Sequence, residues 1–174
     1  WVLPTQTNGE YFIFENRAAV ESDSAQMNPA YSRAKSPGLY VWHIDQSRIN
    51  TGSFDNTINT GAVQGVALEQ ADGFNQLRQP SPNNNRGDLG DAFDGSTVPG
   101  LRTNAGKLVP GRIDSIRIVG NTVLFRYRLE NLLQITKFGT GTGNIQSSVP
   151  GNTADGIGVT PGTVVTLAPI PTPN

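Results

Sequence analysis

The chain has 174 residues, of which only 36% are hydrophobic, and it contains 20 glycines and 12 prolines. Such a composition favours a β-rich protein with long loops over a helical bundle. The absence of cysteine excludes a disulfide scaffold and a thiolate zinc site. The net charge of −1 leaves no basic field for nucleic acid or an anionic membrane, so we expect neither as a partner.

Short apolar runs of β-forming residues predict the strands. Such runs occupy residues 11–14, 39–44 and 63–68, each bounded by glycine or polar residues. Two further runs, 113–118 and 123–128, are joined by a Gly-Asn pair at 120–121, which predicts a β-hairpin. One short helix is expected within residues 18–27. A long loop is expected over residues 74–111, and loops of that length are often functional or held by a bound ion.

The composition changes near residue 131. Short strands separated by Gly-Thr turns follow, for example at residues 139–143 and 162–167. This stretch resembles the β repeats of bacterial extracellular proteins, and the chain ends at Asn174, before such a repeat should end. We therefore predict an all-β fold: an antiparallel sandwich-like domain over residues 1–130, and a partial β repeat or tail over residues 131–174.

Four motifs stand in a specific order along the first 130 residues. They are GEYFIFENR at 9–17, GLYVWHID at 38–45, GVALEQADG at 65–73 and GDLGDAFDG at 87–95. In this order they resemble the part of the M6 metallopeptidases, of the immune inhibitor A type, that follows the zinc-binding helix. The resemblance covers residues 5–128. It implies a secreted, zinc-dependent endopeptidase, stabilised by calcium, with a protein substrate.

The residues that perform the peptidase chemistry are absent from this chain. It has one histidine, His43, and no His-Glu-x-x-His sequence, whereas a catalytic zinc site needs about three protein ligands. By itself the chain is expected to be inactive, with zinc held by another part of the parent protein. The resemblance therefore implies a supporting portion that shapes the substrate cleft and has the zinc-binding half as its partner. Since the chain begins at Trp1, without an initiator methionine, we expect it to start inside a longer protein.

His43 lies on an apolar strand between Trp42 and Ile44. Alternation along the strand predicts that Trp42 and Ile44 face one side and His43 the other. The favoured interpretation is a structural histidine that hydrogen-bonds to a carboxylate or a backbone group. The alternative is a residue that contacts the substrate in the intact enzyme, or one that contacts a ligand of the zinc ion bound elsewhere in that enzyme.

The loop at residues 87–95 is the predicted metal site. Its aspartates recur every three residues among glycines, and closely spaced carboxylates on such a loop can converge on calcium, which takes six to eight oxygen ligands. The predicted ligands are Asp88, Asp91 and Asp94, with Asp45, Glu69 or Asp72 available to complete the shell. The alternative is a cluster of Gly-Asp turns held by side-chain-to-backbone hydrogen bonds.

Other functions remain open on sequence alone. Glu15, Glu69 and Asp72 could form a paired-carboxylate hydrolase site if two of them met across a cleft. The chain could also be an extracellular β-sandwich that binds carbohydrate or a cell surface through the long loop, or a structural spacer. Carbohydrate binding calls for exposed aromatic side chains, but we expect Trp42 to be buried and Trp1 to lie at a frayed end.

Overall fold

The computed structural model describes residues 1–26, 36–79, 87–138, 143–151 and 156–171. The chain divides into two compact units, of which one comprises residues 1–99 and 113–127 and the other residues 100–112 and 128–174. The second unit therefore resumes close to the predicted boundary at residue 131. It also takes in residues 100–112, which the sequence had placed in the first domain.

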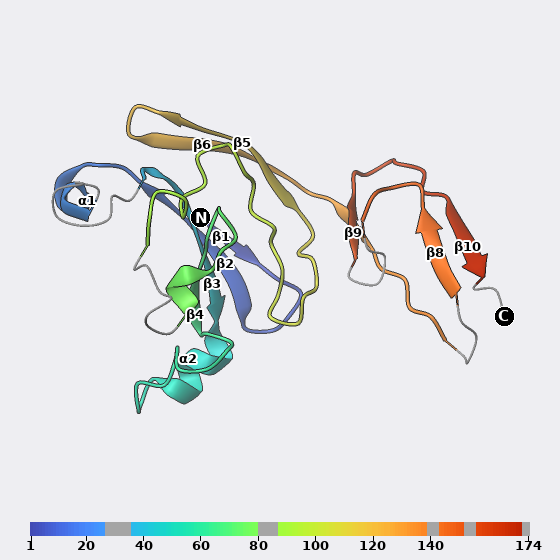
Figure 1. Ribbon diagram of the computed structural model, residues 1–174, viewed down its shortest axis with the longest axis horizontal. Helices are drawn as coiled ribbons and strands as arrows, with labels where there is room; N and C mark the ends of the chain where they lie inside the picture. Colours follow the sequence, from blue (N-terminus) through green and yellow to red (C-terminus); the bar gives the residue numbers. More distant parts are fainter. Residues whose placement is uncertain (27–35, 80–86, 139–142, 152–155, 172–174) are drawn as a thin grey trace. The chain divides into compact units, whose positions relative to one another are not determined.

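The first unit is built on a four-stranded antiparallel sheet whose strands lie side by side in chain order (Figure 1). Its strands are β1 (Val2–Pro4), β2 (Glu10–Arg17), β3 (Gly38–Asp45) and β4 (Val66–Glu69). Strands β2 and β3 pair along their full length, from Glu10 opposite Asp45 to Arg17 opposite Gly38. The predicted strands at 11–14, 39–44 and 63–68 thus correspond to β2, β3 and β4.

Strand β3 is the centre of the sheet and is covered on both faces. His43 lies opposite Phe12 on β2 and Ala67 on β4, and all three are buried on one face. Trp42, opposite Leu68, faces the other side, as the alternation predicts. Its side chain is half-buried rather than buried, and its Nε1 donates to Glu15 Oε2 at 2.7 Å.

The N-terminus is part of the fold, and the expectation of a frayed end was wrong. The Trp1 ring packs against Phe14, Phe125 and Tyr127, with ring centroids 5.0, 5.8 and 5.0 Å away. The Trp1 carbonyl oxygen accepts a hydrogen bond from Phe14 N at 2.8 Å. These contacts hold β1, a strand that was not predicted from the sequence.

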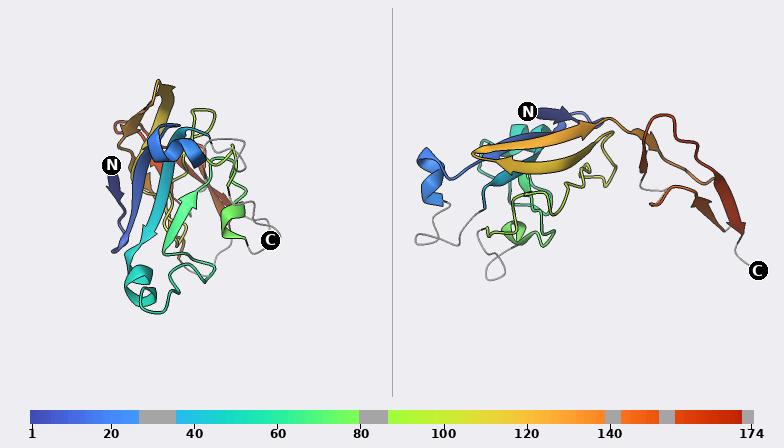
Figure 2. Two further views of the ribbon diagram at one scale, coloured as in Figure 1. Left: turned by 90° about the vertical axis from the view of Figure 1, so that its left-hand side faces the viewer. Right: turned by 90° about the horizontal axis from the view of Figure 1, so that it is seen from above.

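The predicted hairpin is confirmed. Strands β5 (Arg112–Val119) and β6 (Thr122–Arg128) run side by side as a two-stranded ribbon (Figure 2), joined at Gly120, whose φ of +58° suits glycine. The Asn16 side chain on β2 donates to Asn121 O at 2.9 Å and accepts from Val123 N at 3.1 Å. This side chain thereby ties the hairpin turn to the central sheet.

Helical structure is sparse. Helix α1 (Glu21–Gln26) falls within the predicted range 18–27, whose last residue lies outside the described residues. Helix α2 (Gln46–Gly52) was not predicted. The preceding residue, Asp45, is its N-cap, and the Asp45 side chain accepts hydrogen bonds from the backbone of the first turn. A 3-10 turn, η1 (Gln76–Arg78), is the regular element at the start of the long loop. In the described parts of the chain, no helix has the length and apolar character needed to span a membrane.

The second unit contains two small antiparallel pairs. Strand β7 (Asn131–Leu133) pairs with β9 (Ile157–Val159), and β8 (Gly143–Ser147) pairs with β10 (Leu167–Pro171). The predicted β-rich class is therefore confirmed for both units, while the sandwich-like arrangement stays a prediction. Of the Gly-Thr turn at 139–143, residues 139–142 lie outside the described residues.

Candidate metal centre

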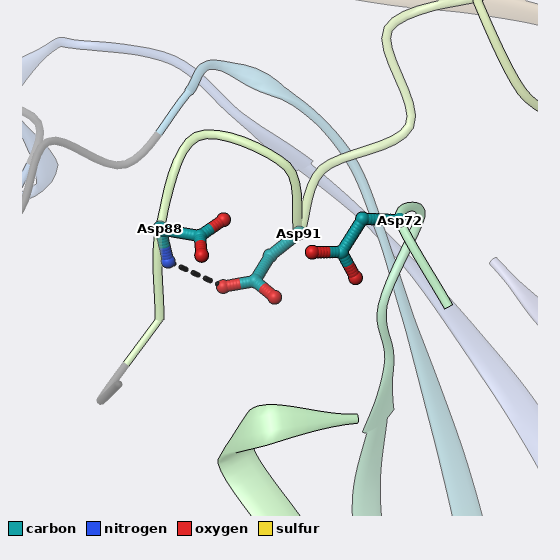
Figure 3. A group of neighbouring side chains, drawn as sticks. All are labelled: Asp72, Asp88 and Asp91. Carbon is teal, nitrogen blue, oxygen red and sulfur yellow. Dashed lines mark hydrogen bonds between the residues drawn. The ribbon is translucent and has the colours of Figure 1, made fainter. Parts of the chain in front are cut away.

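Three carboxylates from two separate segments meet at one end of the central sheet. Asp72 follows β4, and Asp88 and Asp91 lie on the loop at 87–91; Figure 3 shows their side chains around a common space. One oxygen of each residue lies within 4.8 Å of the others. Asp91 is 2% exposed, whereas Asp72 and Asp88 are half-buried.

Backbone pairing brings the two segments together. Ala71 N donates to Asp91 O at 3.1 Å, and Asp72 N donates to Gly90 O at 3.0 Å. Two residues further on, Phe93 exchanges a pair of 3.0 Å backbone hydrogen bonds with Leu39 on β3. The loop is thus attached both to the end of β4 and to the start of β3.

Gly90 is the residue that permits this close approach. A Cβ at position 90 would lie 3.1 Å from Asp72 Cβ, 3.1 Å from Asp72 Oδ2 and 3.2 Å from Asp88 Oδ1. These distances are shorter than ordinary van der Waals contact, so any larger residue would push the two aspartates apart. The glycine predicted to relax the loop in fact makes room for the carboxylates.

Each of the three carboxylates also stabilises a turn. Asp72 Oδ1 accepts from Phe74 N at 2.9 Å, and Asp88 Oδ1 accepts from Gly90 N at 2.7 Å. Asp91 Oδ2 accepts from Asp88 N at 2.7 Å, the bond dashed in Figure 3. The turn chemistry considered as the alternative is therefore present. It does not compete with a cation, because a carboxylate has two oxygens and about four lone-pair sites.

The arrangement could hold a metal ion. Calcium–oxygen distances of about 2.3–2.6 Å allow two ligand oxygens to lie up to about 5 Å apart, and the three oxygens fall within that span. Three negative charges this close repel one another, and a divalent cation between them would convert that repulsion into attraction. The remaining ligands would be carbonyl oxygens or water, as is usual for calcium.

Asp94, the third predicted ligand, does not join this group. Its Oδ1 accepts hydrogen bonds from Ser96 N at 2.9 Å and Ser96 Oγ at 2.7 Å, and these bonds lower the pKa of the Asp94 carboxyl. The backbone turns at Gly95, where φ is +112°, so the three-residue spacing does not continue on one side of the loop. Asp94 therefore lies outside the group and its role as a ligand stays a prediction, whereas Asp88 and Asp91 lie together.

Of the three residues offered to complete the shell, Asp72 is the one that lies with Asp88 and Asp91. Asp45 instead caps α2, accepting from Ser47 N at 3.1 Å. Glu69 pairs with Arg78 Nη2 at 2.9 Å. Sequence reasoning had no signal to choose among them, because the pairing of residues 71–72 with 90–91 is a tertiary contact.

His43 has the structural role that was favoured. Its Nε2 lies 2.9 Å from Glu10 Oε2 and its Nδ1 lies 3.4 Å from Glu69 Oε1, and the ring is 5% exposed. Burial alone would lower the His43 pKa, but the hydrogen bonds and charges of Glu69 and Glu10 outweigh it and raise the pKa above 6.5. Burial would likewise raise the Glu69 pKa, but His43 and Arg78 outweigh it and lower that pKa below 4.5.

The register separates two of the three residues of the paired-carboxylate alternative, Glu15 and Glu69. Glu15 lies opposite Tyr40, and Glu69 lies opposite Val41. Since successive residues of a strand point to opposite faces, Glu15 and Glu69 project from opposite sides of the sheet. They cannot flank one scissile bond.

Comparison with known proteins adds no relative. No protein-family model matches the chain, and neither curated proteins nor solved structures give a significant match.

Proposed function

We propose that this chain is a non-catalytic supporting portion of a secreted zinc-dependent endopeptidase, and that it binds one calcium ion through Asp72, Asp88 and Asp91. The convergence of these three carboxylates from two segments carries the calcium part of the proposal. The ordered motifs at 9–17, 38–45, 65–73 and 87–95 carry the peptidase part. In the intact enzyme the chain would pack against the zinc-binding half and shape the cleft for a protein substrate.

The cation would act as a cross-link. Asp72 continues from β4, and Asp88 and Asp91 belong to the loop that also pairs with β3 through Phe93. Backbone hydrogen bonds already join these two segments. Bound calcium would add ionic bonds from carboxylates of both segments to one cation. It would thereby hold the loop at 87–95 in a fixed position on the sheet, which is what a cleft wall requires.

The calcium site is tested by thermal and denaturant unfolding with calcium and with excess EDTA. A ligand bound by the native state alone raises stability by RT ln(1 + [L]/Kd), so calcium at about 100 times Kd should add roughly 2.7 kcal/mol. We expect Asp72→Asn and Asp88→Asn to lose most of this increase. In EDTA, the same variants should be at least as stable as the wild type, because each removes one of three repelling charges and keeps an oxygen for the turn.

Asp94→Asn is the matched control. It neutralises an aspartate three residues from Asp91 that lies outside the group, so the calcium-dependent increase should be retained. The calcium proposal is wrong if the wild type shows no increase, or if Asp94→Asn loses it as fully as Asp72→Asn does.

The peptidase part is tested separately, by reading the coding sequence ahead of Trp1. We expect a His-Glu-x-x-His motif upstream, which would supply the zinc ligands and the general base. A reading frame that opens near Trp1, or an upstream region without such a motif, would contradict this part and leave the calcium result standing.

A further inference from the structure

A row of four charged or titratable side chains crosses the central sheet away from the aspartate group. It runs from Glu10 on β2, through His43 on β3 and Glu69 on β4, to Arg78 on η1. Consecutive members are separated by 2.9, 3.4 and 2.9 Å. Their signs alternate when His43 is protonated, so each group then faces an opposite charge.

The centre of the row is shielded from water. His43 is 5% exposed and Glu10 8% exposed, and the Phe12 ring stacks on the imidazole with centroids 4.5 Å apart. Buried charges are stable only when they are paired. A neutral imidazole carries one N–H and could donate to one of the two carboxylates, whereas the imidazolium donates to both. The geometry therefore suits the protonated ring.

We propose that His43 is a proton-dependent tie between β2, β3 and β4: as an imidazolium it binds the carboxylates of both flanking strands, and its deprotonation breaks that link. The charged groups that act on His43 are Glu10 from β2 and Glu69 from β4. From η1, Arg78 acts through Glu69 and also donates to Leu68 O at 3.2 Å, so it holds the outer strand in place.

The direction of the pH dependence follows from the two pKa shifts. The pKa of His43 is raised above 6.5, so the folded state binds more protons, and this contribution is complete below pH 6.5 and is lost as the pH rises through the folded pKa. The pKa of Glu69 is lowered below 4.5, so its contribution is complete above pH 4.5 and is lost as the pH falls through its folded pKa. The row therefore stabilises the sheet fully between pH 4.5 and 6.5.

The test is a nuclear magnetic resonance titration of the His43 ring in the folded chain. The sequence has one histidine, so its ring signals need no assignment. Working in EDTA separates the result from the calcium proposal. We expect a titration midpoint above 6.5, lower midpoints in Glu69→Gln and Glu10→Gln, and no change in the control Glu15→Gln, whose carboxylate faces the opposite side of the sheet.

Denaturant unfolding of the wild type from pH 6 to pH 9 supplies the second readout. It does not depend on whether a variant of a buried residue folds. The unfolding equilibrium constant of the wild type should rise by up to tenfold for each unit by which the folded pKa exceeds the unfolded one. This slope should be absent in His43→Gln. A wild-type midpoint at or below 6.5, or a midpoint that Glu69→Gln leaves unchanged, overturns the proposal.

Discussion

At the scale of single residues, the local geometry of the loop decides which aspartates converge. The repeat at residues 88, 91 and 94 predicted two members of the group, because a tight Gly-Asp turn brings residues three apart together. Asp94 lies outside this group, since Gly95 adopts a φ of +112° and the Asp94 carboxylate accepts a hydrogen bond from Ser96 N in the next turn. Regular spacing along a loop therefore predicts which side chains lie together only while the backbone keeps turning in the same direction.

A substitution at Gly90 should push Asp72 away from the loop that carries Asp88 and Asp91. In Gly90→Ala the added methyl would meet Asp72 and Asp88 at 3.1–3.2 Å, and such overpacking costs about 1–3 kcal/mol. Because both neighbours are proposed ligands, the calcium-dependent gain in stability should shrink as well. Chemical denaturation with and without calcium measures both effects.

The control for this substitution is Gly100→Ala. A Cβ at position 100 meets nothing within 4 Å, so we expect little change in stability or in the calcium response. If Gly90→Ala were as neutral as the control, the close approach of Asp72 to the loop would not be required for the fold or for the site.

At the scale of elements, strands that carry apolar runs were predictable and elements held by single polar contacts were not. Strands β2 and β3 and the β5–β6 hairpin follow from β-forming residues between turn signals. Helix α2 has no apolar periodicity; its signal was Asp45 followed by Ser47, an N-cap that could have been recognised. Strand β1 depends on the packing of Trp1, which local sequence does not encode.

Strand β4 shows how polar side chains complete a short outer strand. The Asn59 side chain donates to Val66 O and accepts from Val66 N, at 2.9 and 3.0 Å, and Arg78 donates to Leu68 O. These bonds occupy backbone groups on β4 that would otherwise be open to another strand. Side-chain contacts thus add to the pairing of β4 with β3, and β4 leads directly to Asp72.

At the scale of the whole molecule, the β-rich class followed from composition and from the strand signals, but the grouping of residues did not. Residues 100–112 belong to the second unit although they stand in the chain between two segments of the first unit. No change in composition marks either boundary. The candidate site shows the same limit, because Asp72 joins Asp88 and Asp91 only through tertiary pairing. The peptidase function that the ordered motifs suggest stays a proposal.

Calorimetric titration of the EDTA-treated, desalted chain with calcium measures the proposed calcium site itself. We expect saturable binding of one ion per chain, with a Kd of about 1 mM or tighter, the range of extracellular calcium sites. Absence of saturable uptake at that concentration, or equal uptake by Asp72→Asn, would show that the proposed site is wrong. In that case the three aspartates would be turn-forming residues alone.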